Sequence, residues 1–288
     1  MDNRLSDIEV DFVEFISQKT GRDLETTKKI FLETKNRFKF VTPKYTKFSG
    51  QIQSFFRILY EPVNEQRSIE SYQFHGLLHL FRYISYSYPK PFSVYIREIL
   101  SMLRRGQFRN IAVYGIRLVK NKFKGILKNK DVANISTAQL LVKGINGSPV
   151  IVDYGSGLAY TSFEIGKLAH DTKVYLVDMP TITLEFSEFR FKKHGISVET
   201  IPVTIEDPYP KLPKHNICIA SEVMEHLIQP LSAYSNVHDS LEVGGVLYGN
   251  FEDHEKGTFH VSYLLHDLRE KIAQDFEKTG HNLYKKIK

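Results

Sequence analysis

Residues 150–159 read VIVDYGSGLA, a short apolar run that ends in an acid and two closely spaced glycines. The run predicts a buried strand, and residues 161–169 predict a helix after it. Glycines let the backbone turn tightly and approach a ligand closely, and the N-terminus of the following helix offers NH groups. The stretch therefore predicts a strand, a ligand-binding loop and a helix in succession.

The same alternation continues to the end of the chain. Further apolar runs predict strands, and amphipathic stretches between them predict helices. Because helices that connect parallel strands cover both faces of the sheet, this order predicts an α/β fold, a Rossmann-like doubly wound sheet. The expected strands are 150–152, 174–177, 198–201, 217–220 and 246–250, and the expected helices are 161–169, 182–194, 230–241 and 259–278.

The first half of the chain has a different texture. Its apolar residues recur at intervals of three and four, as in Ile8, Phe12, Phe15 and Ile16, which predicts helices. Ser6 is a candidate cap for the first of them, with Glu9 three residues later. The turn-rich residues 144–149 mark a boundary. We therefore expect an all-helical N-terminal domain at 1–143 and the α/β domain at 144–288.

Charge divides the chain in the same way. The 288 residues carry a net charge of +6, and their composition is that of a globular protein, which excludes a disordered or fibrous chain. Residues 1–150 hold 25 basic and 13 acidic side chains, whereas residues 151–288 hold 14 and 20. Within residues 97–130, ten Lys or Arg accompany one acid, Glu98. The basic half is suited to hold an anionic partner.

Cysteine content and hydropathy bear on the compartment. Cys218 is the single cysteine, so no internal disulfide can form, which fits a reducing environment. The N-terminal residues lack the basic and apolar stretches of a signal peptide, and no apolar run reaches the length that spans a bilayer. A soluble, cytoplasmic protein with no transmembrane segment is expected.

A second motif separates two kinds of nucleotide-binding protein. Asp178 lies 21 residues after Gly157, where a carboxylate can accept the hydroxyls of a ribose in a dehydrogenase or in an S-adenosylmethionine enzyme. Residues 217–227, ICIASEVMEHL, are followed by Pro230 and by 241–250, LEVGGVLYGN. This combination resembles strands 4 and 5 of the class I S-adenosylmethionine (SAM)-dependent methyltransferases. The resemblance covers about residues 136–280.

The resemblance implies SAM as the cofactor and assigns residues to it. The loop made by Asp153, Tyr154, Gly155 and Gly157 would surround the methionine moiety, and Asp178 would bind the ribose hydroxyls. The remaining implied contacts are to the adenine and to the floor of the site: Met179, Ile205, Glu206, Ser221 and Glu222. The family's sheet ends in a hairpin of strands 6 and 7, yet only 281–288 follow the last expected helix, so the seventh strand is expected to be absent or replaced.

Methyl transfer needs a group that removes a proton from the acceptor. His254 and His260, after the fifth strand, and His226, after the fourth, are the candidate bases. His75 and His79 share one helix face, and a divalent metal held with Glu252, Asp253 or His254 is an option that is not favoured.

The sequence thus favours an O-methyltransferase acting on a sugar-containing or other small anionic metabolite, with residues 1–143 as lid and substrate-recognition domain. Two alternatives remain. One is an RNA methyltransferase whose basic helices bind nucleic acid, and the other is a non-catalytic SAM-binding scaffold that docks on a partner or a membrane surface. The oligomeric state stays open.

Overall fold

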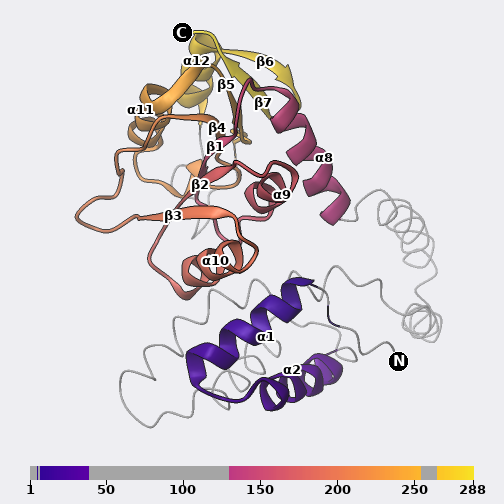
Figure 1. Ribbon diagram of the computed structural model, residues 1–288. Coiled ribbons are helices and arrows are strands. Elements are labelled where there is room, and N and C mark those ends of the chain that lie inside the picture. The colour runs from indigo at the N-terminus through magenta and orange to yellow at the C-terminus, as the bar shows by residue number, and fades with distance from the viewer. Residues whose placement is uncertain (1–4, 6, 39–129, 254–264) are drawn as a thin grey trace, which may run out of the picture.

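A computed structural model describes residue 5 and residues 7–38, 130–253 and 265–288 (Figure 1). The strands are β1 (Val150–Tyr154), β2 (Lys173–Asp178), β3 (Ser197–Pro202), β4 (His215–Ile219), β5 (Leu241–Tyr248), β6 (Phe276–Gly280) and β7 (Leu283–Lys286). The helices are α1 (Asp7–Thr20), α2 (Leu24–Phe38), α8 (Lys130–Lys143), α9 (Tyr160–Leu168), α10 (Ile182–Lys193), the short 3-10 helix η2 (Met224–His226), α11 (Pro230–Ser240) and α12 (His266–Asp275). No helix among the described residues is long and apolar enough to cross a membrane.

The strands form a single seven-stranded sheet in the order β3-β2-β1-β4-β5-β7-β6. The first five strands are parallel, and β7 runs antiparallel to both β5 and β6. The order reverses between β1 and β4, which are adjacent although two strands separate them in the sequence. In open parallel sheets ligands bind at such a switch point, beyond the carboxyl ends of the strands.

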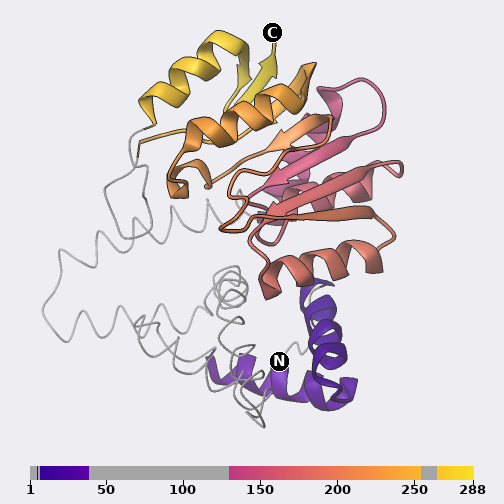
Figure 2. The same ribbon diagram turned by 90° about the vertical axis from the view of Figure 1, so that its left-hand side faces the viewer.

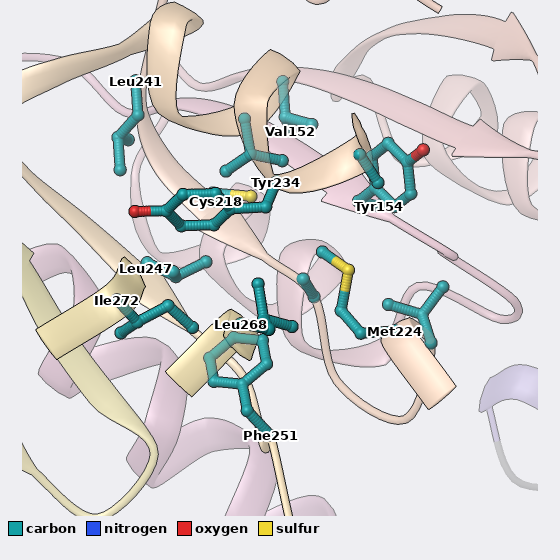
Figure 3. Close-up of a cluster of buried hydrophobic side chains, with 14 of the residues drawn as sticks. Val152, Tyr154, Cys218, Met224, Tyr234, Leu241, Leu247, Phe251, Leu268 and Ile272 are labelled. Carbon is teal, nitrogen blue, oxygen red and sulfur yellow. The ribbon is translucent and has the colours of Figure 1, made fainter. Parts of the chain in front are cut away.

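Apolar side chains alternate along the strands and build a core on each face of the sheet. On one face, Ile151, Val174 and Ile217 pack against α8, α9 and α10. On the other face, α11 and α12 cover the sheet: Figure 3 shows Val152 and Cys218 on the side of Tyr234, Leu268 and Ile272. Helices on both faces of a largely parallel sheet confirm the expected Rossmann-like fold.

The C-terminal end of the sheet corrects the sequence prediction. The expected helix at 259–278 overruns, because α12 ends at Asp275 and β6 begins at Phe276. The chain then turns through His281 and Asn282, whose positive φ of 56° is tolerated by asparagine, and returns as β7. Both strands of the terminal hairpin are therefore present, and the prediction of a missing seventh strand was wrong.

Strand β5 also begins earlier than expected. The pair Gly244 and Gly245 was expected to open the strand at 246, but it lies within Leu241–Tyr248. Gly244 has a φ of 83°, and the register with β4 shifts between His215 and Ile217. A bulge thus accommodates the glycines inside the strand, where sequence patterns favour a turn.

Helix α1 packs on the outside of α10, and α2 packs on α1. The rings of Phe12 and Phe15 lie 5.8 and 5.5 Å from that of Phe186, and Figure 2 shows α1 below α10, on the side away from the sheet. Of the helical domain expected at 1–143, α1, α2 and α8 are described, and α8 packs on the sheet rather than on α1 and α2. The basic segment 97–130 and the pair His75 and His79 lie outside the described residues, apart from the backbone of Lys130 at the start of α8.

Candidate functional site

The glycine loop after β1 is fixed by bonds from two other elements. The amide of Gly155 donates to Val177 O at 2.8 Å, and that of Gly157 donates to Asp178 Oδ2 at 2.7 Å. The hydroxyl of Ser187, from α10, donates to Gly157 O at 2.8 Å. Strand β2 and helix α10 therefore hold the loop in one shape before any ligand arrives.

Both glycines adopt left-handed backbone conformations, for different reasons. Gly155 has a φ of 69°, and a Cβ there would lie 2.5 Å from Val223 Cγ2, so the position admits no side chain. Gly157 has a φ of 48°, and a Cβ there would have no atom within 4 Å. The lack of a side chain at Gly155 lets the loop after β4 pack against the loop after β1. The lack of one at Gly157 leaves open space in which a ligand can approach the backbone.

Asp178 lies at the rim of this space, at the carboxyl end of β2. Its Oδ1 accepts the amide of Met179 at 2.7 Å and its Oδ2 accepts that of Gly157. Burial raises the pKa of this carboxyl, and the two amide donors oppose the rise. Since a carboxylate oxygen can accept more than one hydrogen bond, both oxygens retain capacity for a pair of hydroxyls.

Asp153, at the end of β1, is buried below the loop. Its Oδ2 accepts the hydroxyl of Ser162 in α9 at 2.5 Å. Burial raises its pKa to about 7, the Ser162 hydrogen bond opposes this, and the neighbouring charge of Asp178 adds to it. The ring of the next residue, Tyr154, packs into the core below the β4 loop (Figure 3). Asp153 is thus a carboxyl whose charge can change near neutral pH.

The side chains expected at the adenine lie beside Asp178. Met179 follows β2 with 60% of its surface exposed, and Ile205, in the loop after β3, is 95% exposed. Glu206 is exposed, and its own backbone amide and Thr204 lower the pKa of its carboxyl. Met179 and Ile205 are thus two large apolar side chains exposed after neighbouring strands, β2 and β3.

Ser221 and Glu222 follow β4, on the other side of the switch point. Both contact Asn250, at the end of β5, which the sequence analysis did not single out. Its position as the polar last residue of the strand expected at 246–250 was the available signal. Ser162, Ser187 and Val223 were missed as well, because their roles come from contacts with distant segments.

The structure describes one of the three histidines proposed as bases. His226 ends η2, and its Nε2 lies 3.9 Å from Oε1 of the buried Glu225. His254 and His260 lie outside the described residues. His226 is thus the candidate base whose position is described, close to the carboxyl end of β4.

The metal option finds no support at Asp253. Its carboxylate accepts two hydrogen bonds from Arg269, at 2.7 and 2.9 Å, and a third from the amide of Leu265. These bonds lower its pKa to about 2. Among the described residues, one group has the spacing to hold an ion, His266 with Asp267 and Glu270, and it lies exposed on α12.

Of the comparisons with known proteins, the comparison with solved structures gives matches and the other two do not. No family model matches the chain, and no curated protein matches its sequence. A structure titled as that of LaPhzM matches with a TM-score of 0.38 and 14% identity, over 67% of this chain and 68% of that one. An O-methyltransferase family 2 protein from Planctomyces limnophilus, in complex with apigenin, matches with a TM-score of 0.39 and 15% identity, over 52% and 56%.

A putative methyltransferase from Bacillus halodurans matches with a TM-score of 0.40 and 16% identity, over 50% of this chain and 69% of that one. The chain thus spans between about half and two thirds of these three proteins. The fold class of the present chain rests on its own strand order, β3-β2-β1-β4-β5-β7-β6.

Proposed function

We propose that this chain is a SAM-dependent methyltransferase that transfers a methyl group to an oxygen of a sugar-containing or other small anionic acceptor. One observation carries the cofactor assignment: Asp178 accepts the amide of Gly157, a glycine with open space on its Cβ side, next to the point where the strand order reverses. A carboxylate beside a glycine loop and a helix N-terminus suits a ligand that joins a ribose to an amino acid.

The residues present fit SAM. Asp178 would accept the ribose hydroxyls, Met179 and Ile205 would lie against the adenine, and Glu206 would accept its amino group. Ala159 caps α9 with a left-handed backbone and no side-chain hydrogen bond, so the first turn of that helix can face the carboxylate of the methionine moiety. When bound, the cofactor supplies an electrophilic methyl group on a sulfonium.

The chain's own task is to orient the acceptor and to take up its proton. His226 lies near the end of β4, on the side of the switch point away from Asp178, so it is suited to contact an acceptor that enters there. His254 and His260, in the segment after β5, remain the other proposed bases. Residues 1–143 would select the acceptor through their basic side chains.

Calorimetric titration with SAM and with S-adenosylhomocysteine tests the cofactor assignment. We expect both to bind the full chain, and we expect Asp178→Ala to weaken both at least tenfold. Asp171→Ala, at the exposed amino end of the same strand, is the matched control and should bind as the unmodified chain does. Absence of binding by the unmodified chain would refute the proposal.

Turnover distinguishes the two alternatives. An RNA methyltransferase would transfer label from methyl-labelled SAM to RNA, and its RNA affinity would fall steeply with salt concentration. A scaffold would bind SAM but label no acceptor among sugars, anionic metabolites and RNA. The small-molecule proposal predicts label in the metabolite fraction alone.

A further inference from the structure

Glu222 and Asn250 form a two-point contact across the ends of β4 and β5. The backbone amide of Glu222 donates to Asn250 Oδ1 at 2.8 Å. The Nδ2 group of the same asparagine donates to Glu222 Oε1. One amide side chain therefore fixes both the backbone and the carboxylate of Glu222.

The backbone of Glu222 is held in an unfavourable conformation. Its φ is 56°, in the left-handed region that non-glycine residues seldom adopt. Such conformations persist where the surroundings enforce them, and they are frequent at ligand-binding sites. Gly249 supplies part of the enforcement, because a Cβ there would lie 2.4 Å from Ala220 O, so that the two strands approach closely just before the contact.

The position of Glu222 relative to Asp178 determines which part of the cofactor Glu222 would contact. The order of strands is β2-β1-β4-β5, so Asp178 and Glu222 stand on opposite sides of the switch point. If the ribose of SAM binds at Asp178, its sulfonium would lie on the side of the site toward β4, where Glu222 follows the strand. Of the other described carboxylates that follow β4 and β5, Glu225 is buried and Asp253 is paired with Arg269, whereas Glu252 is exposed, two residues beyond Asn250.

We propose that Glu222, held by Asn250, recognises the positive charge of the sulfonium and so favours SAM over its product S-adenosylhomocysteine. The product has a neutral thioether in place of the sulfonium, and therefore loses the attraction to the carboxylate. A fixed carboxylate pays little reorganisation when the cation arrives, which is the role of Asn250 as a positioning residue. Product release is thereby favoured after each transfer. This inference rests on the proposed function.

The ratio of two dissociation constants tests the inference without knowledge of the acceptor. We would titrate SAM, S-adenosylhomocysteine and sinefungin, a cationic analogue with an amine-bearing carbon in place of the sulfonium, into the full-length chain. Glu222→Gln keeps the shape of the side chain and its bond to Asn250 but removes the charge. We expect the preference for SAM over S-adenosylhomocysteine to fall about fivefold to tenfold, as for the loss of a partly screened ion pair. The preference for sinefungin should fall in parallel.

Two further variants separate charge recognition from general damage. Asn250→Ala should lower the same preference, because the carboxylate is no longer held, while its melting temperature reports whether the fold survives. Glu242→Gln, an exposed carboxylate on β5 at the far end of the strand, should leave the preference unchanged. An unchanged preference in Glu222→Gln, with both ligands still bound, would overturn this inference and leave the proposed function standing. Failure of the unmodified chain to bind either ligand would overturn both.

Discussion

Gly155 and Val223 are in such close contact that a single added methyl group cannot fit between them. A Cβ on Gly155 would lie 2.5 Å from Cγ2 and 2.8 Å from Cβ of Val223. The contact joins the loop after β1 to the loop after β4, the two segments that flank the switch point. The shape of the candidate cofactor site therefore depends on this contact.

We expect Gly155→Ala to lower the free energy of unfolding by about 2–4 kcal/mol, from the left-handed φ of 69° and the overpacking together. Urea unfolding measures the loss, and SAM titration should show weaker binding. The double variant Gly155→Ala/Val223→Ala removes the contact with Cγ2 but keeps the one with Cβ, so it should recover part of the overpacking, with a coupling of about 1 kcal/mol. Strictly additive losses would contradict the contact as the cause.

Local sequence signals predicted one side of the candidate site and missed the other. The loop at Gly155 and Gly157 and the acid at Asp178 lie directly after apolar strands, so spacing along the chain locates them. Asn250 and Ser187 act on partners 28 and 30 residues away, and no periodicity encodes such pairings.

The terminal hairpin was missed for a related reason. The helical pattern of α12 runs on without a marked break into residues 276–278, and pairing with β7 makes those residues a strand. Tertiary contacts override local preference at that point. The five parallel strands were predicted because each is a short apolar run with turn formers beside it.

Asp11 of α1 binds the C-terminal end of α10. Its carboxylate lies 3.2 Å from Arg190 Nε and 2.8 Å from Lys193 Nζ, and it accepts a hydrogen bond from His194 Nε2 at 3.1 Å. Arg190 is 5% exposed, and its guanidinium carbon lies 3.6 Å from the centre of the Phe163 ring. Burial lowers the pKa of Arg190, and the Asp11 charge opposes that effect.

We expect Asp11→Asn to cost about 3–5 kcal/mol in the free energy of unfolding, because it leaves a buried guanidinium without its counter-charge. Glu14→Gln is the control, since Glu14 bonds to Lys193 at the surface and its loss should cost under about 1 kcal/mol. Urea unfolding compares the two. Equal losses would show that the buried pair contributes no more than a surface pair.

Asp153 predicts a stability that falls as pH rises. Its pKa is about 7 in the folded chain and near 3.8 when unfolded. The unfolded state therefore releases its proton first, and the folded state loses stability between pH 4 and 7. By linkage, the full difference is roughly 4 kcal/mol. Asp153→Asn, which can still accept from Ser162, should be more stable than the unmodified chain at pH 8 and no more stable at pH 4. Denaturant unfolding at both pH values measures this.

Binding of a cation should lower the pKa of the Asp153 carboxyl. If SAM places its ammonium group near Asp153, binding favours the charged form and releases a proton. Titration at pH 7 in two buffers of different ionisation enthalpy would count that proton, and Asp153→Asn should release fewer. Identical apparent enthalpies in both buffers would contradict the coupling.

The lowered pKa of His215 predicts a contribution to stability that changes with pH in the opposite direction. The ring is fully buried at the start of β4, where burial lowers its pKa to about 4 and the hydrogen bond to Pro213 O opposes the shift. The unfolded state, with a pKa near 6.5, takes up its proton first, so the contribution of His215 to stability falls by about 3 kcal/mol as pH drops from 6.5 to 4, opposite in sign to that of Asp153. His215→Gln should remove this contribution, whereas His170→Gln, at an exposed histidine, should preserve it. The unfolding free energy of His215→Gln minus that of the unmodified chain, measured at each pH from 7 to 4, isolates the contribution, and a difference that does not change with pH would contradict it.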